Sequence, residues 1–327
     1  MYCRKFLLII LIILGHSFLP GQTFNQLWVD NERLKSPIQF KDDDETLKIK
    51  LEHIKEINQT RKQFGLQPVE LDMFASRVAN MHCVDMVKYN YAGHWDSIGS
   101  KPYQRYALNG GIDHVSENVY MLQAYRTIAH REYLYTQDPA KIPEYLSKGF
   151  EAFMSEKPPN DGHRKEILNP NHTHVGLGYA NGTTGFRYCE EFIDRYLELN
   201  TFDKSIFAGQ RITFTGKVLD SNFGIYGAAI YYDSPLSPYP NLAHQPNRYP
   251  DYGEKWFKNI TPWETRFNFS TQEFSIPVSF DNAKTGLYYV ILYVKSSPQS
   301  IPYNATGRVE WNTAYGIPAT SIVIDVR

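Results

Sequence analysis

The hydrophobic periodicity of the chain changes near residue 205, and this change constrains the fold more than any other feature. In the first part of the chain, apolar side chains such as Leu47, Leu51 and Ile54 recur at steps of three and four. That spacing predicts amphipathic helices. From Ser205 onward, short segments alternate or run in β-branched and aromatic residues, and turn residues such as Thr285-Gly286 separate them. The chain is therefore expected to contain two domains, of which the second is all β.

The first domain is expected to mix helices with a small antiparallel sheet, an α+β arrangement. Its predicted helices cover residues 47–64, 69–88 and a stretch that begins with Pro143. Gly65 and Pro68 should end the first of them. Two strands follow, at residues 174–180 and 186–196, and the turn at 181–185 between them predicts a hairpin.

The second domain has no helical period and is predicted to be an immunoglobulin-like β-sandwich. Its strands are expected at residues 211–219, 226–232, 272–280, 287–294 and 320–326. A long insertion at 233–263 is rich in Pro, Tyr and Asn. Long loops of this kind are often functional, and an ordered but inert surface loop is an equally good interpretation.

The N-terminus has the order of a secretory signal peptide. Arg4 and Lys5 precede an apolar run at residues 6–14, and Pro20-Gly21-Gln22 follows. The run is too short to span a bilayer comfortably, although an uncleaved membrane anchor is the alternative. We expect a signal peptide at 1–22 cleaved near Gly21, a linker at 23–45, a first domain at 46–200 and a second at 205–327. The protein would then be extracellular or in the cell envelope, with no membrane span after signal removal.

Charge and cysteine content narrow the function classes. The chain has 34 Lys and Arg against 35 Asp and Glu, for a net charge of −1, and no basic run. This balance argues against nucleic-acid binding. Without the signal peptide two cysteines remain, Cys83 and Cys189. Export permits a disulfide between them, and two buried thiols are the alternative.

Histidines and carboxylates gather where regular elements are predicted to stop. The segments are Gly93-His94, Ser116-Glu117, Ser155-Glu156 and Gly162-His163. Two imidazoles and two carboxylates suit Zn²⁺ or a similar cation. The same groups could instead act as a general base on water. Each histidine alone could also be a hydrogen-bonded structural residue, which is the expectation for His82 within a helix.

Several segments, in order, resemble the CAP family of cysteine-rich secretory, antigen-five and pathogenesis-related proteins. Residues 57–71 resemble the opening of the CAP domain. Ser116-Glu117-Asn118 is similar to the family's GEN motif, and the segment from Phe153 to Glu156 is similar to its W..E motif. Residues 162–168, followed by 175–178, resemble the bacterial form GHR..IL…GVG. The resemblance covers about residues 47–196.

This resemblance implies an α-β-α sandwich and a four-residue site. His94, Glu117, Glu156 and His163 fall at the positions of the CAP tetrad, which lines a central cleft and binds Zn²⁺ or another divalent ion in several members. Residues 157–161 are an insertion after Glu156, and Asp161 is therefore a substitute candidate for that carboxylate.

The chain differs from the family motifs at two positions near the site, and three other histidines are close to the motifs in sequence. Ser116 replaces the usual Gly, which is tolerable if its φ is negative, and Phe153 replaces the usual Trp. His114 is close enough in sequence to Glu117 to support it, whereas His172 and His174 are expected to be solvated.

Two functions are compatible with these residues. The first is binding of an extracellular small molecule, lipid, glycan or protein in a cleft that also holds a divalent cation, with Zn²⁺ favoured. The second is a metal-dependent, peptidase-like hydrolase in which Glu117 and His163 are catalytic.

Overall fold

The computed structural model describes residues 22–128, 131–134, 138–246, 248–250, 252–305 and 310–327. The expected signal peptide therefore lies outside the described residues, apart from Gln22. Within these ranges, no helix combines the length and the apolar character that a membrane span requires.

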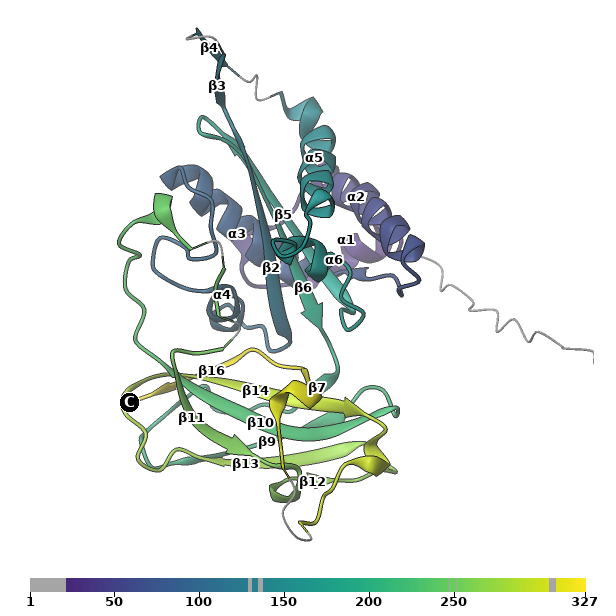
Figure 1. Ribbon diagram of the computed structural model, residues 1–327, viewed down its shortest axis with the longest axis vertical. Coiled ribbons are helices and arrows are strands. Elements are labelled where there is room, and N and C mark those ends of the chain that lie inside the picture. Colours follow the sequence, from purple (N-terminus) through teal and green to yellow (C-terminus); the bar gives the residue numbers. More distant parts are fainter. Residues whose placement is uncertain (1–21, 129–130, 135–137, 247, 251, 306–309) are drawn as a thin grey trace, which may run out of the picture.

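The first domain is built on a four-stranded sheet with helices on both faces (Figure 1). In sheet order the strands are β1 (Glu70–Leu71), β5 (His174–Gly182), β6 (Gly185–Asp194) and β2 (His114–Gln123). β1 is parallel to β5 and the other pairs are antiparallel. β2 is thus an edge strand. The α+β prediction is confirmed, with the order helix layer, sheet, helix layer.

The two helix layers bury different sets of side chains. One face of the sheet is covered by α3 (Met73–Tyr89) and α4 (Pro102–Leu108). The other face is covered by α2 (Asp44–Gln63), α5 (Ile142–Ser155) and α6 (Gly162–Ile167). Alternate residues of β6 separate accordingly, because Tyr188 and Phe192 join the α2–α5 core whereas Ile193 packs with α3 and α4.

Capping side chains determine where the helices begin. The Asp43 carboxylate accepts a hydrogen bond from the Thr46 N–H and starts α2, and Gly65, at φ +74°, follows its end. α3 begins at Met73, four residues later than expected, because Asp72 caps it by accepting from the Ala75 N–H. The residues before it form β1 instead.

The segment expected to be a linker contains a folded helix, α1 (Phe24–Arg33). Leu27 is fully buried, and the Asn31 side chain accepts hydrogen bonds from the buried guanidinium of Arg77. Phe24 and Leu27, three residues apart, pack in the α2–α5 core and are the apolar signal that the linker prediction overlooked.

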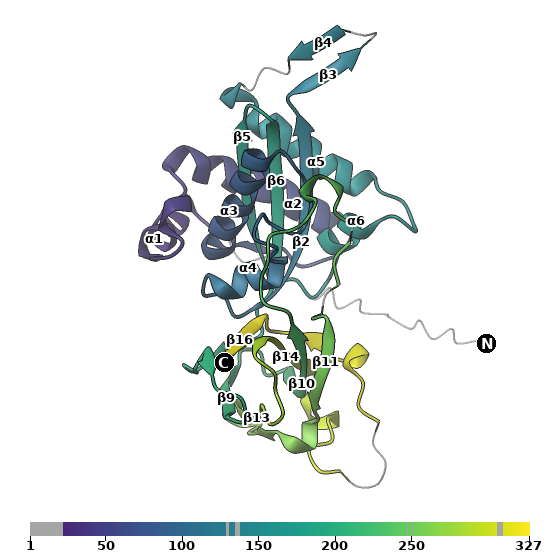
Figure 2. The same ribbon diagram turned by 90° about the vertical axis from the view of Figure 1, so that its left-hand side faces the viewer.

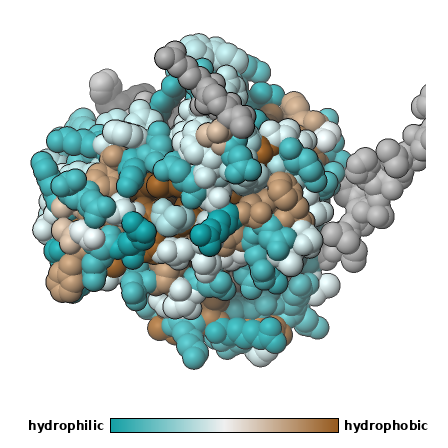
Figure 3. Space-filling view, turned by 90° about the horizontal axis from the view of Figure 1, so that it is seen from below, coloured by the Kyte–Doolittle hydropathy of each residue, from teal (hydrophilic) through white to brown (hydrophobic). Residues whose placement is uncertain are grey.

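The second domain is a sandwich of two sheets around one apolar core. One sheet contains β11 (Lys255–Ile260), β10 (Phe223–Asp233), β14 (Gly286–Ser296), β16 (Ile322–Val326) and β8 (Ser205–Ile206), with β15 (Ile317–Pro318) beside β14. The other contains β12 (Arg266–Phe267), β13 (Glu273–Ser279), β9 (Arg211–Val218) and β7 (Leu197–Leu199). β7 pairs with β9, so this domain draws a strand from within the range expected for the first domain. Seen from the sandwich end, apolar side chains are interspersed among hydrophilic ones (Figure 3).

A buried aromatic interface joins the two domains. Tyr103 of α4 stacks on Tyr289 of β14, with ring centroids 3.9 Å apart. The Tyr103 hydroxyl donates to the Asp233 carboxylate at 2.7 Å, and Lys101 Nζ lies 3.0 Å from that group. Asp233 ends β10, so this contact fixes the point where the long insertion leaves the sandwich.

We expect Gly178→Ala to lower the free energy of unfolding by about 1–3 kcal/mol, the usual effect of overpacking. An added Cβ at Gly178 would lie 2.2 Å from the backbone carbon of Ala79, where α3 packs on β5. Chemical denaturation measures the effect. Gly162→Ala is the control, since its added Cβ meets no atom within 4 Å. Equal effects of the two substitutions would contradict this packing argument.

Candidate functional site

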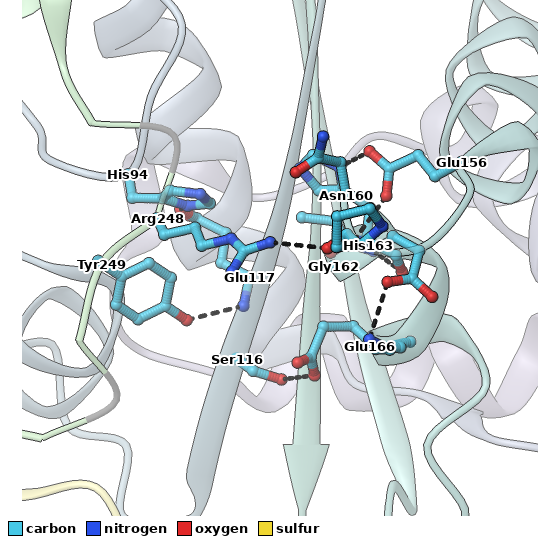
Figure 4. Close-up of a pocket in the computed structure, with 14 residues that line it drawn as sticks. His94, Ser116, Glu117, Glu156, Asn160, Gly162, His163, Glu166, Arg248 and Tyr249 are labelled. Atoms are coloured by element: carbon cyan, nitrogen blue, oxygen red, sulfur yellow. Dashed lines mark hydrogen bonds and ion pairs between the residues drawn. The ribbon is translucent and has the colours of Figure 1, made fainter.

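A pocket of about 420 Å³ opens at the edge strand β2 (Figure 4). His94, Glu117, Glu156 and His163 all line it. These residues come from the loop after α3, from β2, from the end of α5 and from α6. The fold therefore brings together, at one pocket, four side chains that are up to 69 residues apart in sequence (163 − 94).

The first pair within the pocket is His94 and Glu117. His94 Nδ1 lies 2.9 Å from Glu117 Oε1. The guanidinium of Arg105, on α4, contacts the other oxygen of the same carboxylate and also donates to the His94 carbonyl at 3.3 Å. Arg105 therefore holds both members of the pair.

Burial determines the charge state around Glu117. Burial raises the pKa of Glu117, and the Arg105 charge offsets part of this effect, which leaves the pKa at about 7. Glu191 of β6 lies 3.6 Å from Arg105. Burial, together with the Glu117 charge, raises the pKa of Glu191 well above its usual range. Of these two coupled carboxyls, Glu191 is therefore the one that holds its proton more tightly.

The second pair is Glu156 and His163. His163 Nδ1 lies 2.6 Å from Glu156 Oε1, and the His163 N–H donates to Glu156 Oε2 at 3.0 Å. The Phe153 ring stacks on the imidazole with centroids 4.6 Å apart, so this replacement keeps an aromatic wall. Asp161 pairs with Lys165 at 2.8 Å instead. Glu156, rather than Asp161, is thus the partner of His163.

The two pairs lie on either side of β2. Figure 4 shows His94 and Tyr249 on one side of the pocket and Glu156 and His163 on the other. Successive residues of a strand point to opposite faces. Accordingly Glu117 reaches Arg105 of α4, whereas its neighbour Ser116 donates to Glu166 of α6 at 2.8 Å. Ser116 does not have a positive φ, so the replacement of Gly by Ser causes no backbone strain.

A different group of side chains satisfies the distances of a metal site. Among the described residues, ligand atoms of His82, Glu117 and Cys189 lie within 4.8 Å of one another, and all three side chains are buried. The predicted set of His94, Glu117, Glu156 and His163 lines one pocket but does not meet this distance. Arg105 contacts the same Glu117 carboxylate, and a guanidinium there disfavours a second cation. Cys83 and Cys189 are free thiols with sulfurs 3.2 Å apart, so the structure favours the thiol alternative.

Residues 54–192 match the family model of the cysteine-rich secretory protein family, CAP. The first domain of this chain is a CAP domain. The match covers the predicted motifs and ends before the second domain, and the resemblance drawn from the motifs is thereby confirmed.

Individual relatives match parts of the chain. Bacillus subtilis (strain 168) has an uncharacterized protein, YkwD, that is 30% identical over 140 residues, or 42% of this chain and 44% of YkwD. The chain thus matches less than half the length of that relative. An extracellular protein containing a SCP domain from Bacillus anthracis str. Ames has 21% identity and a TM-score of 0.33, over 44% of this chain and 39% of that one. An outer surface protein from Borrelia burgdorferi has 17% identity and a TM-score of 0.34, over 45% of this chain and 93% of that one.

The second domain contributes residues to the CAP-domain pocket that the sequence analysis did not predict. The long loop between β10 and β11 rises from the sandwich and runs along the CAP domain (Figure 2). Arg248 and Tyr249 from this loop line the pocket. The Tyr249 ring lies 4.7 Å from the His94 ring, and its hydroxyl accepts from the Glu117 N–H at 3.1 Å. The richness in Tyr and Pro was a signal that the loop is unusual, but it did not indicate where the loop lies.

A buried charge network supports the CAP domain next to this pocket. His114 was expected to support Glu117. Instead, its Nδ1 lies 2.9 Å from the Asp194 carboxylate. His172 is buried, and its two ring nitrogens lie 2.6 Å from Asp194 and 3.1 Å from Glu166. Burial lowers the pKa of His172, but the two carboxylates outweigh this effect and raise it to about 9. His172 is therefore an imidazolium that positions Glu166, and its expected solvent exposure is wrong.

We expect the stabilisation by His172 to depend on pH. Its folded pKa of about 9 is above the ordinary value of 6.5, so the contribution is complete below about pH 6.5 and is lost as the pH rises through 9. The difference in unfolding free energy between the wild type and His172→Gln should shrink by on the order of 3 kcal/mol over this range. Denaturation at several pH values measures it. The exposed His244→Gln variant should show no such change, and a pH-independent difference for His172→Gln would contradict the assignment.

Proposed function

We propose that the CAP domain of this chain is a ligand-binding module whose cleft holds a divalent cation. The observation that carries this proposal is that two His–Glu pairs, His94–Glu117 and His163–Glu156, line one pocket. Histidine and carboxylate are ligands of Zn²⁺. The appended sandwich, a fold common in recognition modules, is compatible with this function.

The side chains of the pocket are of the types that bind such a cation, and a cation between the two pairs would draw them closer together. In metal sites, a ligating histidine commonly donates its other ring N–H to a carboxylate, which orients the ring. Both Nδ1 atoms here face a carboxylate. His94 and His163 would therefore be the ligands through Nε2, and Glu117 and Glu156 would orient them. A bound cation would supply positive charge for a carboxylate, phosphate or carbonyl oxygen of the ligand.

Hydrolysis is the second candidate function. A pKa of about 7 suits Glu117 to act as a general base near neutral pH, and His163 would act with it from the other side of the pocket. However, the Glu117 carboxylate is already engaged by His94 and by Arg105. Ligand binding is therefore the better supported function.

Metal analysis tests the cation site. We expect protein purified without chelator to contain about one divalent ion per chain, and His94→Ala/His163→Ala to have lost it because the ligands are gone. His174→Gln, outside the pocket, is the control. Loss of the ion in Cys189→Ser, with retention in the double variant, would move the cation to the buried His82–Glu117–Cys189 group. Peptidase activity abolished by chelator and by the double variant would favour the hydrolase.

We further propose that the chain is exported, because Arg4 and Lys5 precede an apolar run of nine residues at 6–14. We expect the mature protein to begin near Gln22. The intact mass of protein recovered from the medium or the cell envelope measures this. Protein that keeps residues 1–21 and stays inside the cell would contradict it.

A further inference from the structure

The loop between β10 and β11 is clamped at its base and crosses the cleft. We call residues 234–254 the strap; all but 247 and 251 are described. At its base, Asp233 accepts from the Tyr103 hydroxyl and lies within 3.0 Å of Lys101 Nζ. The Glu254 N–H donates to Asp233 Oδ1 at 3.0 Å and closes the loop. Both ends of the strap are therefore held against the CAP domain.

The middle of the strap binds main-chain groups of the CAP domain. The Gln245 side-chain amide accepts from the Trp95 N–H at 2.9 Å and donates to the Trp95 carbonyl at 2.7 Å. This donor and acceptor pair is the one that a peptide group of an added strand would present. Gly93 makes room for it, because an added Cβ there would lie 2.3 Å from Gln245 Oε1.

The strap also covers the edge of β2. The Glu117 N–H donates to the Tyr249 hydroxyl, and two residues earlier the Val115 N–H donates to Ser321 Oγ at 3.2 Å. Both acceptors are side chains of the second domain. An edge strand with unpaired N–H and C=O groups is a template for a further strand, and here side chains occupy its hydrogen-bonding positions.

Further contacts extend the strap from one wall of the cleft to the other. Near its start, the Tyr239 ring lies 5.3 Å from the Trp95 ring. Leu242 packs against a buried cluster that includes Tyr91. Near its end, the Arg248 guanidinium donates to the Pro159 carbonyl at 3.2 Å, in the loop beside Glu156.

We propose that the strap is an intramolecular substitute for the ligand of the cleft, and that this ligand is an extended polypeptide. The polypeptide would replace the strap on the main chain of Trp95 and on the edge of β2. This inference rests on the proposed ligand-binding function and names the class of its ligand. The strap thereby keeps the cleft closed to polypeptides until it is displaced.

The contacts favour a polypeptide over the other ligand classes. Four of the strap's hydrogen bonds go to main-chain groups, of Trp95, Glu117 and Pro159. Recognition of main-chain groups along an edge strand is the means by which sheets bind extended peptides. A lipid tail would need an apolar wall, whereas most of the residues that line this pocket are polar or charged.

The test uses the strap itself as the probe. A synthetic peptide of residues 237–250 is titrated by calorimetry into the intact chain and into a variant whose residues 235–252 are replaced by a short Gly-Ser linker. We expect binding to the shortened variant, with a Kd on the order of 1 mM or tighter because a tethered segment has an effective concentration in that range. We expect none to the intact chain. Binding to both proteins, or to neither up to millimolar peptide, would overturn the proposal.

Peptide variants show whether binding uses the same contacts. A peptide that carries Tyr249→Phe should bind about 5- to 10-fold more weakly, as expected for one lost hydrogen bond. A peptide that carries Gln245→Ala should bind more weakly still, because it loses two hydrogen bonds. A peptide with Asn241→Ala is the matched control and should bind like the parent. A scrambled peptide that binds equally well would also overturn the proposal.

A second measurement uses the full chain, in case the shortened variant does not fold. In the intact protein, Gln245→Ala should speed hydrogen exchange of the Trp95 amide, and Tyr249→Phe that of the Glu117 amide, each by about 10-fold relative to wild type. Tyr252→Phe is the control. Unchanged exchange in both variants would mean that the strap does not protect the cleft.

Metal content is measured on the same samples. If the peptide does not bind but the ion is retained, the strap proposal fails and the cation site stands. Loss of the ion with retained peptide binding would remove only the cation site.

Discussion

The buried ion pair between Arg105 and Glu117 is the interaction on which the cleft depends. Arg105 comes from α4 and Glu117 from β2, and both side chains are almost completely shielded from water. Removing one member of such a pair leaves an uncompensated charge in the interior, at a cost of about 3–5 kcal/mol. The same guanidinium donates to the His94 carbonyl, so the pair also positions the loop that carries His94. One buried contact thus organises half of the pocket.

The charge balance around this pair affects the protonation of the buried carboxyls beside it. Besides Glu117, the carboxyls of Glu191 and Asp96 lie within 4.0 Å of Arg105. One positive charge cannot compensate three negative ones, and the raised pKa of Glu191 relieves the excess by protonation. In the second pair, the Glu156 carboxylate faces the His163 imidazole.

Much of the architecture could be predicted because it is encoded locally. The apolar step of three and four residues and the hairpin turn at 181–185 act within short stretches of chain, and they predicted α2 and the β5–β6 hairpin. One error has a local cause, because α3 begins late where Asp72 caps it. The missed helix α1 is instead held by long-range contacts, among them the contact of Asn31 with Arg77, 46 residues later in the chain.

The sequence by itself determined the two domain types, the CAP motifs and four of the residues that line the pocket, because motifs and periodicities act over short distances along the chain. Only the tertiary structure decided how those residues pair. It also decided that Arg105 lies between the carboxyls of Glu117 and Glu191. It placed Tyr249 of the second domain on the edge of β2. These contacts join residues from different elements and different domains. These contacts form only because the packed cores bring distant parts of the backbone together, and no local sequence pattern predicts that placement.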